Sequence, residues 1–498
     1  MSDTPIFAFD NSYARDLKGF YVPWQGDKTP APKLLRLNHI LAQELGLDVD
    51  MLEGPDGAAI LTGAVTPDGG AALAMAYAGH QFGGFSQQLG DGRAMLVGEV
   101  IDAEGRRRDI HLKGSGRTPF SRGGDGKAVL GPVLREYLIG EAMHALGIPT
   151  TRALAASLTG EEVMRERPEQ GAVLARVATS HLRVGTFQFF AARSEAEKVR
   201  RLADYAIDRH FPDIMQGPEK QDPNRYLEFF RRVRDVQAAL VARWVLVGFV
   251  HGVMNTDNTT ISGETIDYGP CAFIDNYDPK AVFSSIDKQG RYAYGNQPPI
   301  IQWNLSRFAE TLIDLVNPDD SDDAVRQLTN EINAFPARYQ QEWLKGMRLK
   351  LGLTLDQESD LDLVNDLHAA MQGQNVDFTQ FFRSLSDVAR GDTGPARALF
   401  DTPETAFDDW LDRYVNRLAQ EDIDGKSRSL AMDQVNPLYI PRNHKVEEAL
   451  AAARAGDMAP FDRLLEVLSR PFEAQSDAED YAKPAPASFG PYETFCGT

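Results

Sequence analysis

Two glycine-dense segments early in the chain frame a predicted β-hairpin and a predicted helix. The first, AGHQFGGFSQQLGDGRAMLVGEV, leads into strand-like runs at residues 94–101 and 108–112, which a turn at 102–105 joins. The second, GSGRTPFSRGGDG, leads into a helical pattern at residues 133–146 that Gly147 ends. Such glycines either let backbone N–H groups approach phosphates or serve as plain turn residues. The first third of the chain is therefore predicted to be mixed α and β, with a candidate anion site.

Hydrophobic periodicity predicts the other elements. Strands are expected at residues 151–158 and 171–177, helices at 33–47, 195–209 and 231–250, and a second hairpin at 259–262 and 265–268. Residues 54–70 are rich in loop formers, and the chain has a helical pattern from residue 301 onward. The last stretch, residues 476–498, is rich in Pro, Ala, Ser and Gly, which is typical of a mobile tail.

Composition and charge exclude several classes of protein. The 498 residues include 72 acidic and 52 basic side chains, and a formal net charge of −20 repels nucleic acid and anionic lipid surfaces. The two cysteines, Cys271 and Cys496, have no zinc-site spacing and form no disulfide framework. The N-terminus has no leader pattern, and the most apolar run, residues 238–250, is short and contains Arg243. We expect a monomeric, cytoplasmic protein that binds no nucleic acid and no membrane.

The sequence HGVMNTDN followed by TIDYGP has the spacing of the phosphate-transfer motifs of protein kinases. Kinases carry H-R-D-x-x-x-x-N and then D-F-G, in which the first Asp is the base, and the Asn and the second Asp bind metal. Here His251 opens the motif, Asn258 falls on the metal-binding Asn, and Asp267 falls on the second Asp. Val253 stands where kinases have the base and cannot accept a proton, so Asp257 is the candidate base. The structural alternative is an Asx-rich turn between a helix and a hairpin.

Basic residues of the first third match a second feature of phosphate-transfer sites. Lys113 ends the second predicted strand and Glu136 lies in the first turns of the helix after it. In kinases such a pair holds the lysine on the phosphates, although each residue alone is better explained as a solvated strand lysine or a helix-start glutamate. Arg176 and Arg183 carry the planar fork that suits phosphate oxygens, and either alone would be an ordinary surface arginine.

Blocks along most of the chain resemble the selenoprotein O family, the protein adenylyltransferases with a pseudokinase fold. The matching blocks include FDNSYARDLKGFYVPW, QQLGDGRAMLVGE, HLKGSGRTPFSRGGDGKAVL, REYLIGEAMHALGIPTTRAL, HGVMNTDN, TIDYGPCAFID and NPLYIPRNH. The block GPVLREYL departs from the more polar family pattern but keeps Arg135 and Glu136. The resemblance implies that ATP lies inverted relative to kinases. AMP would then be transferred to Ser, Thr or Tyr hydroxyls of proteins, with release of pyrophosphate.

The resemblance also implies a role for each matching site residue. Asp257 would be the base, Asn258 and Asp267 would bind Mg²⁺ or Mn²⁺, and Lys113, oriented by Glu136, would contact phosphate. The rest of the nucleotide site would be formed by Gly90, Gly92, Arg93, Asp125, Gly126, Arg176 and Arg183. The resemblance also implies a second combination of nucleotide and metal, UTP with Mn²⁺.

The fold implied by the resemblance is an α+β, two-lobed, protein-kinase-like architecture with a mixed N-lobe, a helical C-lobe and a further helical region. We expect an N-terminal extension over residues 1–75 and an N-lobe with the nucleotide-binding loops over 76–185. The C-lobe core, with the catalytic loop and the Asp-Tyr-Gly segment, would span 186–300. A helical C-terminal region would cover 301–475, and a flexible tail with Cys496 would cover 476–498.

The two cysteines suggest a redox hypothesis. Cys496 is third from the C-terminus, where some eukaryotic relatives carry selenocysteine, and Cys271 follows the Asp-Tyr-Gly-Pro segment. A disulfide between them under oxidising conditions would gate substrate access. Two independent cysteines are the alternative, because disulfides are uncommon in the cytosol.

Three functions of different classes fit these residues. The first is a protein AMP transferase, and the second is a kinase acting on a protein or a small molecule. Val253 at the position of the kinase base argues against the second. The third is a silent nucleotide-binding scaffold, and the retention of Asp257, Asn258 and Asp267 together argues against it.

Overall fold

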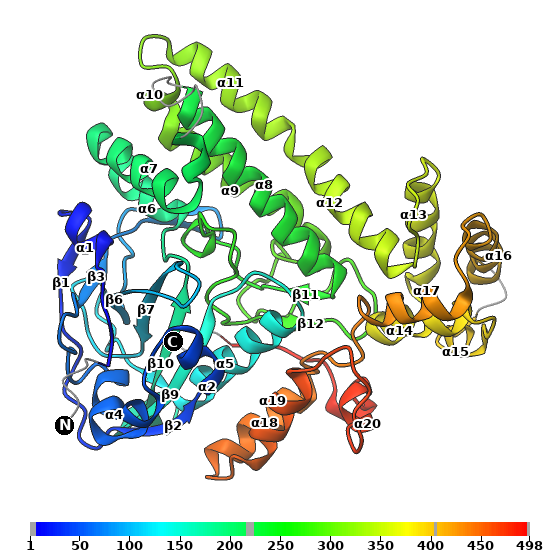
Figure 1. The fold of residues 1–498 in the computed structure, drawn as a ribbon, viewed down its shortest axis with the longest axis horizontal. Coiled ribbons are helices and arrows are strands. Elements are labelled where there is room, and N and C mark those ends of the chain that lie inside the picture. The colour runs from blue at the N-terminus through cyan, green and yellow to red at the C-terminus, as the bar shows by residue number, and fades with distance from the viewer. Residues whose placement is uncertain (1–5, 216–223, 403–405, 496–498) are drawn as a thin grey trace.

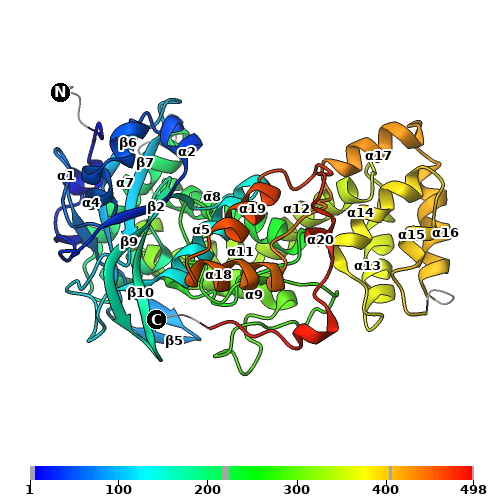
Figure 2. The same ribbon diagram turned by 90° about the horizontal axis from the view of Figure 1, so that it is seen from below.

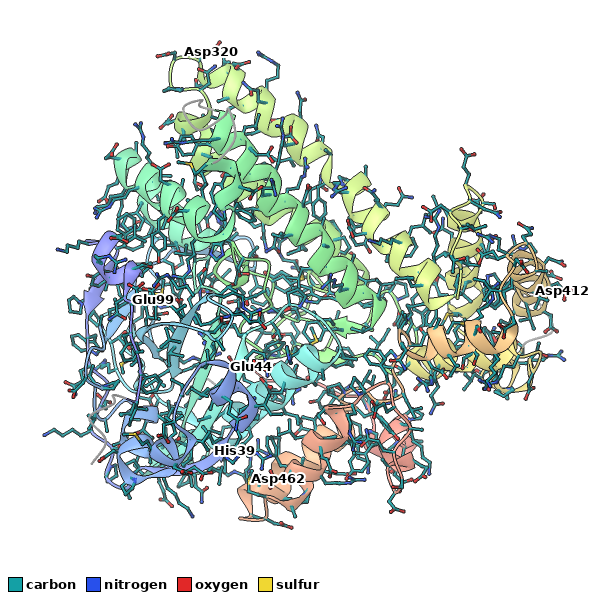
Figure 3. The ribbon with its side chains drawn as sticks, in the orientation of Figure 1. His39, Glu44, Glu99, Asp320, Asp412 and Asp462 are labelled. Atoms are coloured by element: carbon teal, nitrogen blue, oxygen red, sulfur yellow. The ribbon has the colours of Figure 1, made fainter. Side chains whose placement is uncertain are left out.

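A computed structural model describes residues 6–215, 224–402 and 406–495. An antiparallel sheet lies at one end of the molecule, and helices make up most of the rest (Figure 1). The prediction of an α+β fold is confirmed. Acidic side chains lie in different parts of the molecule: Asp320 and Asp412 are well apart, whereas Glu44 and Asp462 line one cavity (Figure 3).

Within the described residues the main sheet has eight strands in the order β1-β3-β6-β7-β10-β9-β2, with β8 paired to β10. Its strands are β1 (Tyr21–Pro23), β2 (Lys33–Leu37), β3 (Leu73–Met75), β6 (Ala94–Ile101), β7 (Arg107–Lys113), β8 (Ala128–Val129), β9 (Arg152–Met164) and β10 (Pro168–Ala178). The predicted hairpin is confirmed, because Ala94 of β6 pairs with Lys113 of β7. Successive side chains of a strand face opposite sides, so Ile110 and Leu112 enter one core while His111 and Lys113 face the other side.

Helices cover both faces of this sheet. On one face lie α2 (His39–Glu44), α3 (Val49–Glu53) and α4 (Pro55–Leu61), whose apolar residues share a core with β7 and β10. On the other face lies α5 (Leu130–Ala145), which packs against β9 and β10. The predicted helix at residues 133–146 is thus confirmed, and its Leu134 and Leu138 are fully buried. Burial of such a leucine contributes about 1.5–3 kcal/mol to stability.

The second half of the described chain is helical, as predicted. The helices that follow the sheet are α6 (Val184–Ala191), α7 (Ala196–His210), α8 (Asn224–Leu246), α9 (Gln297–Ala309), α10 (Ile313–Val316), α11 (Ser321–Asn333) and α12 (Phe335–Lys350). Beyond them come α13 (Asp360–Met371), α14 (Phe378–Ala389), α15 (Gly394–Arg397), α16 (Ala406–Leu418), α17 (Gly425–Asp433), α18 (Asn443–Arg454), α19 (Ala459–Leu468) and α20 (Glu479–Ala482). None of the helices in the described ranges is both long and apolar enough to cross a membrane.

Figure 2 shows how these helices are distributed. The group α13–α17 lies at the end of the molecule opposite the sheet and has a core of its own around Trp410 and Phe381. The pair α18 and α19 returns to pack on α5. A late part of the chain therefore supports the helix that carries Glu136 and Arg135. Helix α1 (Ser12–Asp16) lies at the edge of the sheet.

Three local predictions are wrong. Residues 33–47 are not one helix, because 33–37 pair with β9 and Asn38 then caps α2 by accepting a hydrogen bond from Leu41 N at 3.1 Å. Residues 54–70 contain the helix α4, which Pro55 begins. Residues 259–262 and 265–268 do not pair with each other. Their backbone donors reach distant segments instead, as in Thr265 N to Pro149 O at 2.9 Å.

The C-terminal segment packs on the body of the protein as far as residue 495. Thr494 forms an isolated parallel bridge with Ser284, and its hydroxyl donates to Pro270 O at 2.8 Å. The Tyr492 hydroxyl accepts from Arg135 Nη2 at 2.7 Å. Composition predicts a mobile tail at residues 476–498, and single residues in its described part make these polar contacts with the body of the protein. Cys496 lies outside the described residues.

Candidate active site

One cavity of about 390 Å³ brings nearly all of the predicted site residues together. It lies between the glycine loops, the ends of β7 and β10, and the loop that follows α8. The predicted residues in its wall are Gly90, Gly92, Arg93, Lys113, Asp125, Gly126, Arg176, Arg183, Asp257, Asn258 and Asp267. Glu136 lies behind the wall and bonds to Lys113, and Cys271 is buried directly after the lining residue Pro270.

Three cationic side chains converge on Asp267. Its Oδ1 accepts from Lys113 Nζ and from Arg176 Nη1, both at 2.7 Å, and its Oδ2 accepts from Arg183 Nη1 at 2.9 Å. Burial alone would raise the pKa of Asp267, but these three charges outweigh it and hold the pKa well below its ordinary value. The carboxylate is therefore ionised at neutral pH and acts as the counter-ion of the cluster.

Glu136 completes this cluster from α5. Its Oε2 accepts from Lys113 Nζ at 2.5 Å, and its Oε1 accepts from Arg176 Nη1 at 3.0 Å. The predicted pairing of the strand lysine with the helix glutamate is thus present. Arg176 is held from its other side, where its Nε–H donates to Nδ1 of the buried His111 at 3.2 Å. His111 Nε2 then carries the proton and donates to Asp91 Oδ2 at 3.2 Å.

Local sequence explains how Asp267 reaches this point. The chain bends at Asp267 with φ of +62°, a left-handed conformation that Asp tolerates better than most residues. The short strands β11 (Phe249–Val250) and β12 (Ala272–Phe273) pair on either side and close the loop. Inside it, His251 Nε2 donates to Ile266 O at 2.9 Å. The motif histidine therefore fixes the backbone next to the carboxylate.

Asp257 lies opposite the cluster with one carboxylate oxygen free. Its Oδ2 accepts from Gln81 Nε2 at 3.2 Å, while Oδ1 is buried without a hydrogen-bond partner. Its backbone oxygen accepts from Arg183 Nη1 at 2.8 Å. Burial raises the pKa of Asp257 to about 6. An unpaired carboxylate oxygen with such a pKa can take up a proton near neutral pH.

A small hairpin holds the loop that carries Asp257. It consists of β4 (Gly79–Gln81) and β5 (Gly84–Ser86). His80 N donates to Thr256 Oγ1 at 2.7 Å, and Phe82 N donates to Asn255 Oδ1 at 3.1 Å. Neither this hairpin nor Gln81 was predicted as part of the site. The only signal was the glycine pair within QFGGF, which indicates a tight turn but no contact.

Gly79 is where the hairpin comes closest to Asp257. A Cβ at position 79 would lie 2.5 Å from Asp257 Oδ1 and 3.0 Å from its Cβ. We expect Gly79→Ala to turn the carboxylate away and to lower kcat by about 10–100-fold, because displacements near 1 Å have effects of this size. Steady-state transfer kinetics measure the effect.

Gly84→Ala is the matched control, because a Cβ at position 84 meets no atom closer than Gln81 O at 3.5 Å. Melting temperatures of both variants should stay near that of the unmodified protein. Equal kcat values in the two variants would show that the close approach of Gly79 does not position Asp257.

The wall of the cavity is rich in basic residues, in contrast to the chain as a whole. Besides the predicted ones it contains Arg122, Lys127 and Arg165, for which no role was predicted. Arg122 and Lys127 lie in the block HLKGSGRTPFSRGGDGKAVL, whereas Arg165 matches no motif. Arg165 binds Asp125 through Nη1 and Oδ2 at 2.7 Å, and this hydrogen bond lowers the pKa of Asp125. Gly126 is required here, because its φ is +71° and a Cβ would lie 2.1 Å from Gly116 O.

Oxygen ligands for a divalent cation are present in the same wall. The Asn258 side chain donates Nδ2 to Val253 O at 3.0 Å, which leaves its amide oxygen for a ligand. Asp267 contributes carboxylate oxygens, and hard cations such as Mg²⁺ prefer oxygen ligands completed by substrate phosphates. In the described part of the chain no group of three His, Cys, Asp or Glu residues could hold a metal by itself. The residues present thus fit a cation that is bound together with a phosphate ligand.

A basic, glycine-lined cavity with an unpaired buried carboxylate defines a site for phosphate-transfer chemistry. Comparison with known proteins agrees. The family model described as protein adenylyltransferase SelO matches residues 6–469. A protein nucleotidyltransferase YdiU of Cereibacter sphaeroides is 60% identical over 494 residues, which is 99% of this chain and 100% of that protein.

Relatives of the same name occur in other bacteria. The protein of Mycobacterium sp. (strain KMS) is 55% identical over 492 residues, which is 99% of each chain. The protein of Rhodopseudomonas palustris (strain HaA2) is 54% identical over 498 residues, which is 99% of this chain and 100% of that protein. The chain therefore belongs to the SelO family of protein adenylyltransferases, and its activity is the transfer of a nucleotide to protein.

Proposed function

We propose that this protein transfers AMP from ATP to Ser, Thr or Tyr hydroxyls of other proteins, with Asp257 as the base. The observation that carries the proposal is the buried Asp257 carboxylate, whose Oδ1 has no partner and whose pKa is raised to about 6. It lines the same cavity as the cations around Asp267. A silent scaffold has no use for a base in that position.

The proposed reaction balances as follows. The acceptor hydroxyl oxygen attacks the α-phosphorus of ATP, and a new O–P bond forms. The bond from the α-phosphorus to the oxygen that bridges to the β-phosphate breaks, and pyrophosphate leaves with that electron pair. The hydroxyl proton passes to the Asp257 carboxylate, whose free Oδ1 can receive it.

Charge stabilisation is assigned to the basic wall. Lys113, oriented by Glu136, together with Arg176 and Arg183 would bind phosphate oxygens, and Arg93, Asp125 and the loops with Gly90, Gly92 and Gly126 would enclose the rest of the nucleotide. Mg²⁺ or Mn²⁺, when bound by Asn258 and Asp267, would supply further neutralisation of phosphate charge. UTP is proposed as a second nucleotide.

The proposal includes a kinase-like, two-lobed architecture. The N-lobe would span residues 76–185 and the C-lobe core 186–300, with the helical region 301–475 added to it. The position of the cavity between sheet and helices supports this assignment. The segment 1–75, proposed as an N-terminal extension, contributes β1, β2 and β3 to the main sheet. We place the protein in the cytoplasm as a monomer.

A labelling experiment tests the function. The reduced protein is incubated with a divalent metal, an acceptor protein and ATP labelled at either the α- or the γ-phosphate. We expect stable label on protein from the α-position only. Label from the γ-position only would instead indicate a kinase, and label from neither would indicate a scaffold.

Asp257→Asn is the control for the base. It keeps the shape of the side chain but cannot accept a proton, so we expect kcat to fall by about 10²–10⁴-fold while ATP still binds. In the unmodified protein the rate should fall as the pH drops below about 6, because Asp257 then becomes protonated. A rate independent of pH between 5 and 8 would contradict the role of Asp257.

Redox gating through Cys271 and Cys496 is part of the proposal. Thr494 bonds to Pro270 O at 2.8 Å, so the C-terminal segment reaches the residue next to Cys271. Cys271 itself is buried, and burial raises the pKa of its thiol to about 11. Such a thiol reacts slowly, so the disulfide would form only when the other cysteine has been oxidised first.

A further inference from the structure

The hairpin β4–β5 presents an aromatic surface beside the cavity. Phe82 and Phe85 at its tip are 37% and 41% exposed. The ring of His80 lies 4.8 Å from that of Phe85 and 5.3 Å from that of Trp303 on α9, and Phe82 lies 5.0 Å from Tyr292. We call these five residues, His80, Phe82, Phe85, Tyr292 and Trp303, the aromatic platform. Phe82 and Phe85 are the exposed rings of the platform, His80 and Trp303 are half-buried, and Tyr292 is buried beneath them. Contiguous exposed apolar surface marks binding sites.

The platform is rigidly joined to Asp257. Gln81, between two platform residues, donates to Asp257 Oδ2 at 3.2 Å. Phe82 has φ of +50°, which is strained for a bulky residue, and its N–H is held by both Asn255 Oδ1 and the Tyr292 hydroxyl. Local strain that the surroundings maintain is a feature of functional sites. A chain resting on the platform would therefore lie at a fixed distance from the carboxylate.

An arginine without a carboxylate partner borders the platform. The Arg291 guanidinium carbon lies 4.8 Å from the Trp303 ring centroid and 5.7 Å from that of Tyr292. Among the described residues Arg291 forms no ion pair with a carboxylate, its Nε is buried without a partner, and its side chain hydrogen-bonds to that of Tyr292. The Arg307 guanidinium carbon lies 5.3 Å from the Trp303 ring centroid, and Arg307 is paired with Glu310 at 2.8 Å. In a chain of net charge −20 an unpaired arginine is available to an anion from another molecule.

We propose that the aromatic platform and Arg291 bind the segment of the protein substrate that carries the acceptor hydroxyl. The occupant is an extended peptide segment with an apolar side chain for the rings and an Asp or Glu for Arg291. This inference rests on the proposed function and specifies its substrate class. Gln81 acts in it as a positioning residue that couples the docked segment to Asp257.

Charge and geometry both favour this occupant. A carboxylate near the hydroxyl can accept from the planar Arg291 guanidinium, whereas a basic residue there meets the like charge of Arg291. The rings supply contact area at little loss of side-chain freedom, because edge-on and tilted contacts with neighbouring rings already restrict their rotamers. The repulsion of basic segments would make the site selective for acidic segments, whereas the net negative charge of the chain alone would favour basic ones.

The test uses two peptides that share one hydroxyl residue and one leucine and differ only in flanking Asp or Lys residues. With ATP labelled at the α-phosphate, we expect kcat/KM for the acidic peptide to exceed that for the basic peptide by at least about tenfold. Arg291→Glu should reverse this order, chiefly through KM. The double variant Phe82→Ala/Phe85→Ala should raise KM for both peptides.

Arg326→Glu is the matched control, because it makes the same charge change at a side chain that is 66% exposed on α11. That helix starts after Asp320, which lies at the top of Figure 3, and Arg326 lines none of the walls of the candidate site. ATP affinity, measured by calorimetry, should be the same in all variants. Transfer by Arg291→Glu with unchanged KM for both peptides would overturn the inference alone. Absence of label on both peptides with the unmodified protein would overturn the proposed function, and the inference with it.

Discussion

Replacing Asp267 by asparagine is expected to abolish nucleotide transfer and to lower the melting temperature of the nucleotide-free protein by about 5–10 °C. The carboxylate is the counter-ion of Lys113, Arg176 and Arg183. A neutral amide would leave Lys113 and Arg176 paired with Glu136 and would leave Arg183 without an ion-pair partner among the described residues. Removing one partner from a buried charge cluster costs about 3–5 kcal/mol. Transfer would stop because the amide also removes a proposed metal ligand. Scanning calorimetry and the α-label assay measure the two effects.

The sign of the pH dependence follows from the lowered pKa of Asp267. A group with a depressed pKa in the folded state stabilises the fold fully above its unfolded pKa, near 3.9, and loses this contribution only at lower pH. The difference in melting temperature between the unmodified protein and Asp267→Asn should therefore be constant from pH 5 to 8.

Nucleotide should partly restore the variant. The phosphates of ATP, added without metal, can neutralise the same three cations, so ATP should raise the melting temperature of Asp267→Asn more than that of the unmodified protein. Asp125→Asn is the stability control, because Asp125 is 45% exposed and its pair with Arg165 contributes little. Equal melting temperatures for the two variants would show that Asp267 does not stabilise the fold as the counter-ion of the three cations.

The sequence predicted the parts of the site that lie in local motifs. Asp257, Asn258 and Asp267 could be found because all three lie in one loop, where their separation in sequence limits their separation in space. The short strands β11 and β12 pair on either side of this loop and close it. Lys113 and Glu136 could be paired because the alternation of side chains along a strand and the repeat of a helix predict which way each residue faces. The strand and the helix after it then bring the two side chains together. The cavity confirms that these residues lie together, while their roles stay proposals.

The sequence did not predict contacts between distant loops. Gln81 and Asp257 are far apart in the chain, and only the folded structure shows their hydrogen bond at 3.2 Å. The expected hairpin at 259–268 failed for the same reason, because the backbone of Ile261 bonds to Leu182 O and not to a neighbouring strand. Arg165 and Arg291 lie in no motif. Only the folded structure shows that Arg165 pairs with Asp125 and that Arg291 lies against Trp303.

The largest stabilising substitution is expected far from the site, at Lys350. This lysine ends α12, is 3% exposed, and lies 4.1 Å and 5.4 Å from the ring centroids of Phe382 and Phe378. Burial lowers its pKa to about 7 from an ordinary value of 10.5. We expect Lys350→Met, which keeps the length of the side chain, to stabilise the protein at pH 6 by on the order of 3–5 kcal/mol.

The advantage should disappear as the pH rises. Between about pH 7 and pH 10 the unfolded chain binds a proton at Lys350 that the folded protein does not, so the stability of the unmodified protein increases with pH across this window. The methionine variant has no such proton, and its melting temperature should change less. Lys345→Met is the matched control, because Lys345 is exposed on the same helix and stays solvated in both states. If both methionine variants melt alike at pH 6, the rings of Phe378 and Phe382 compensate the buried charge in full, and the lysine is held there without loss of stability.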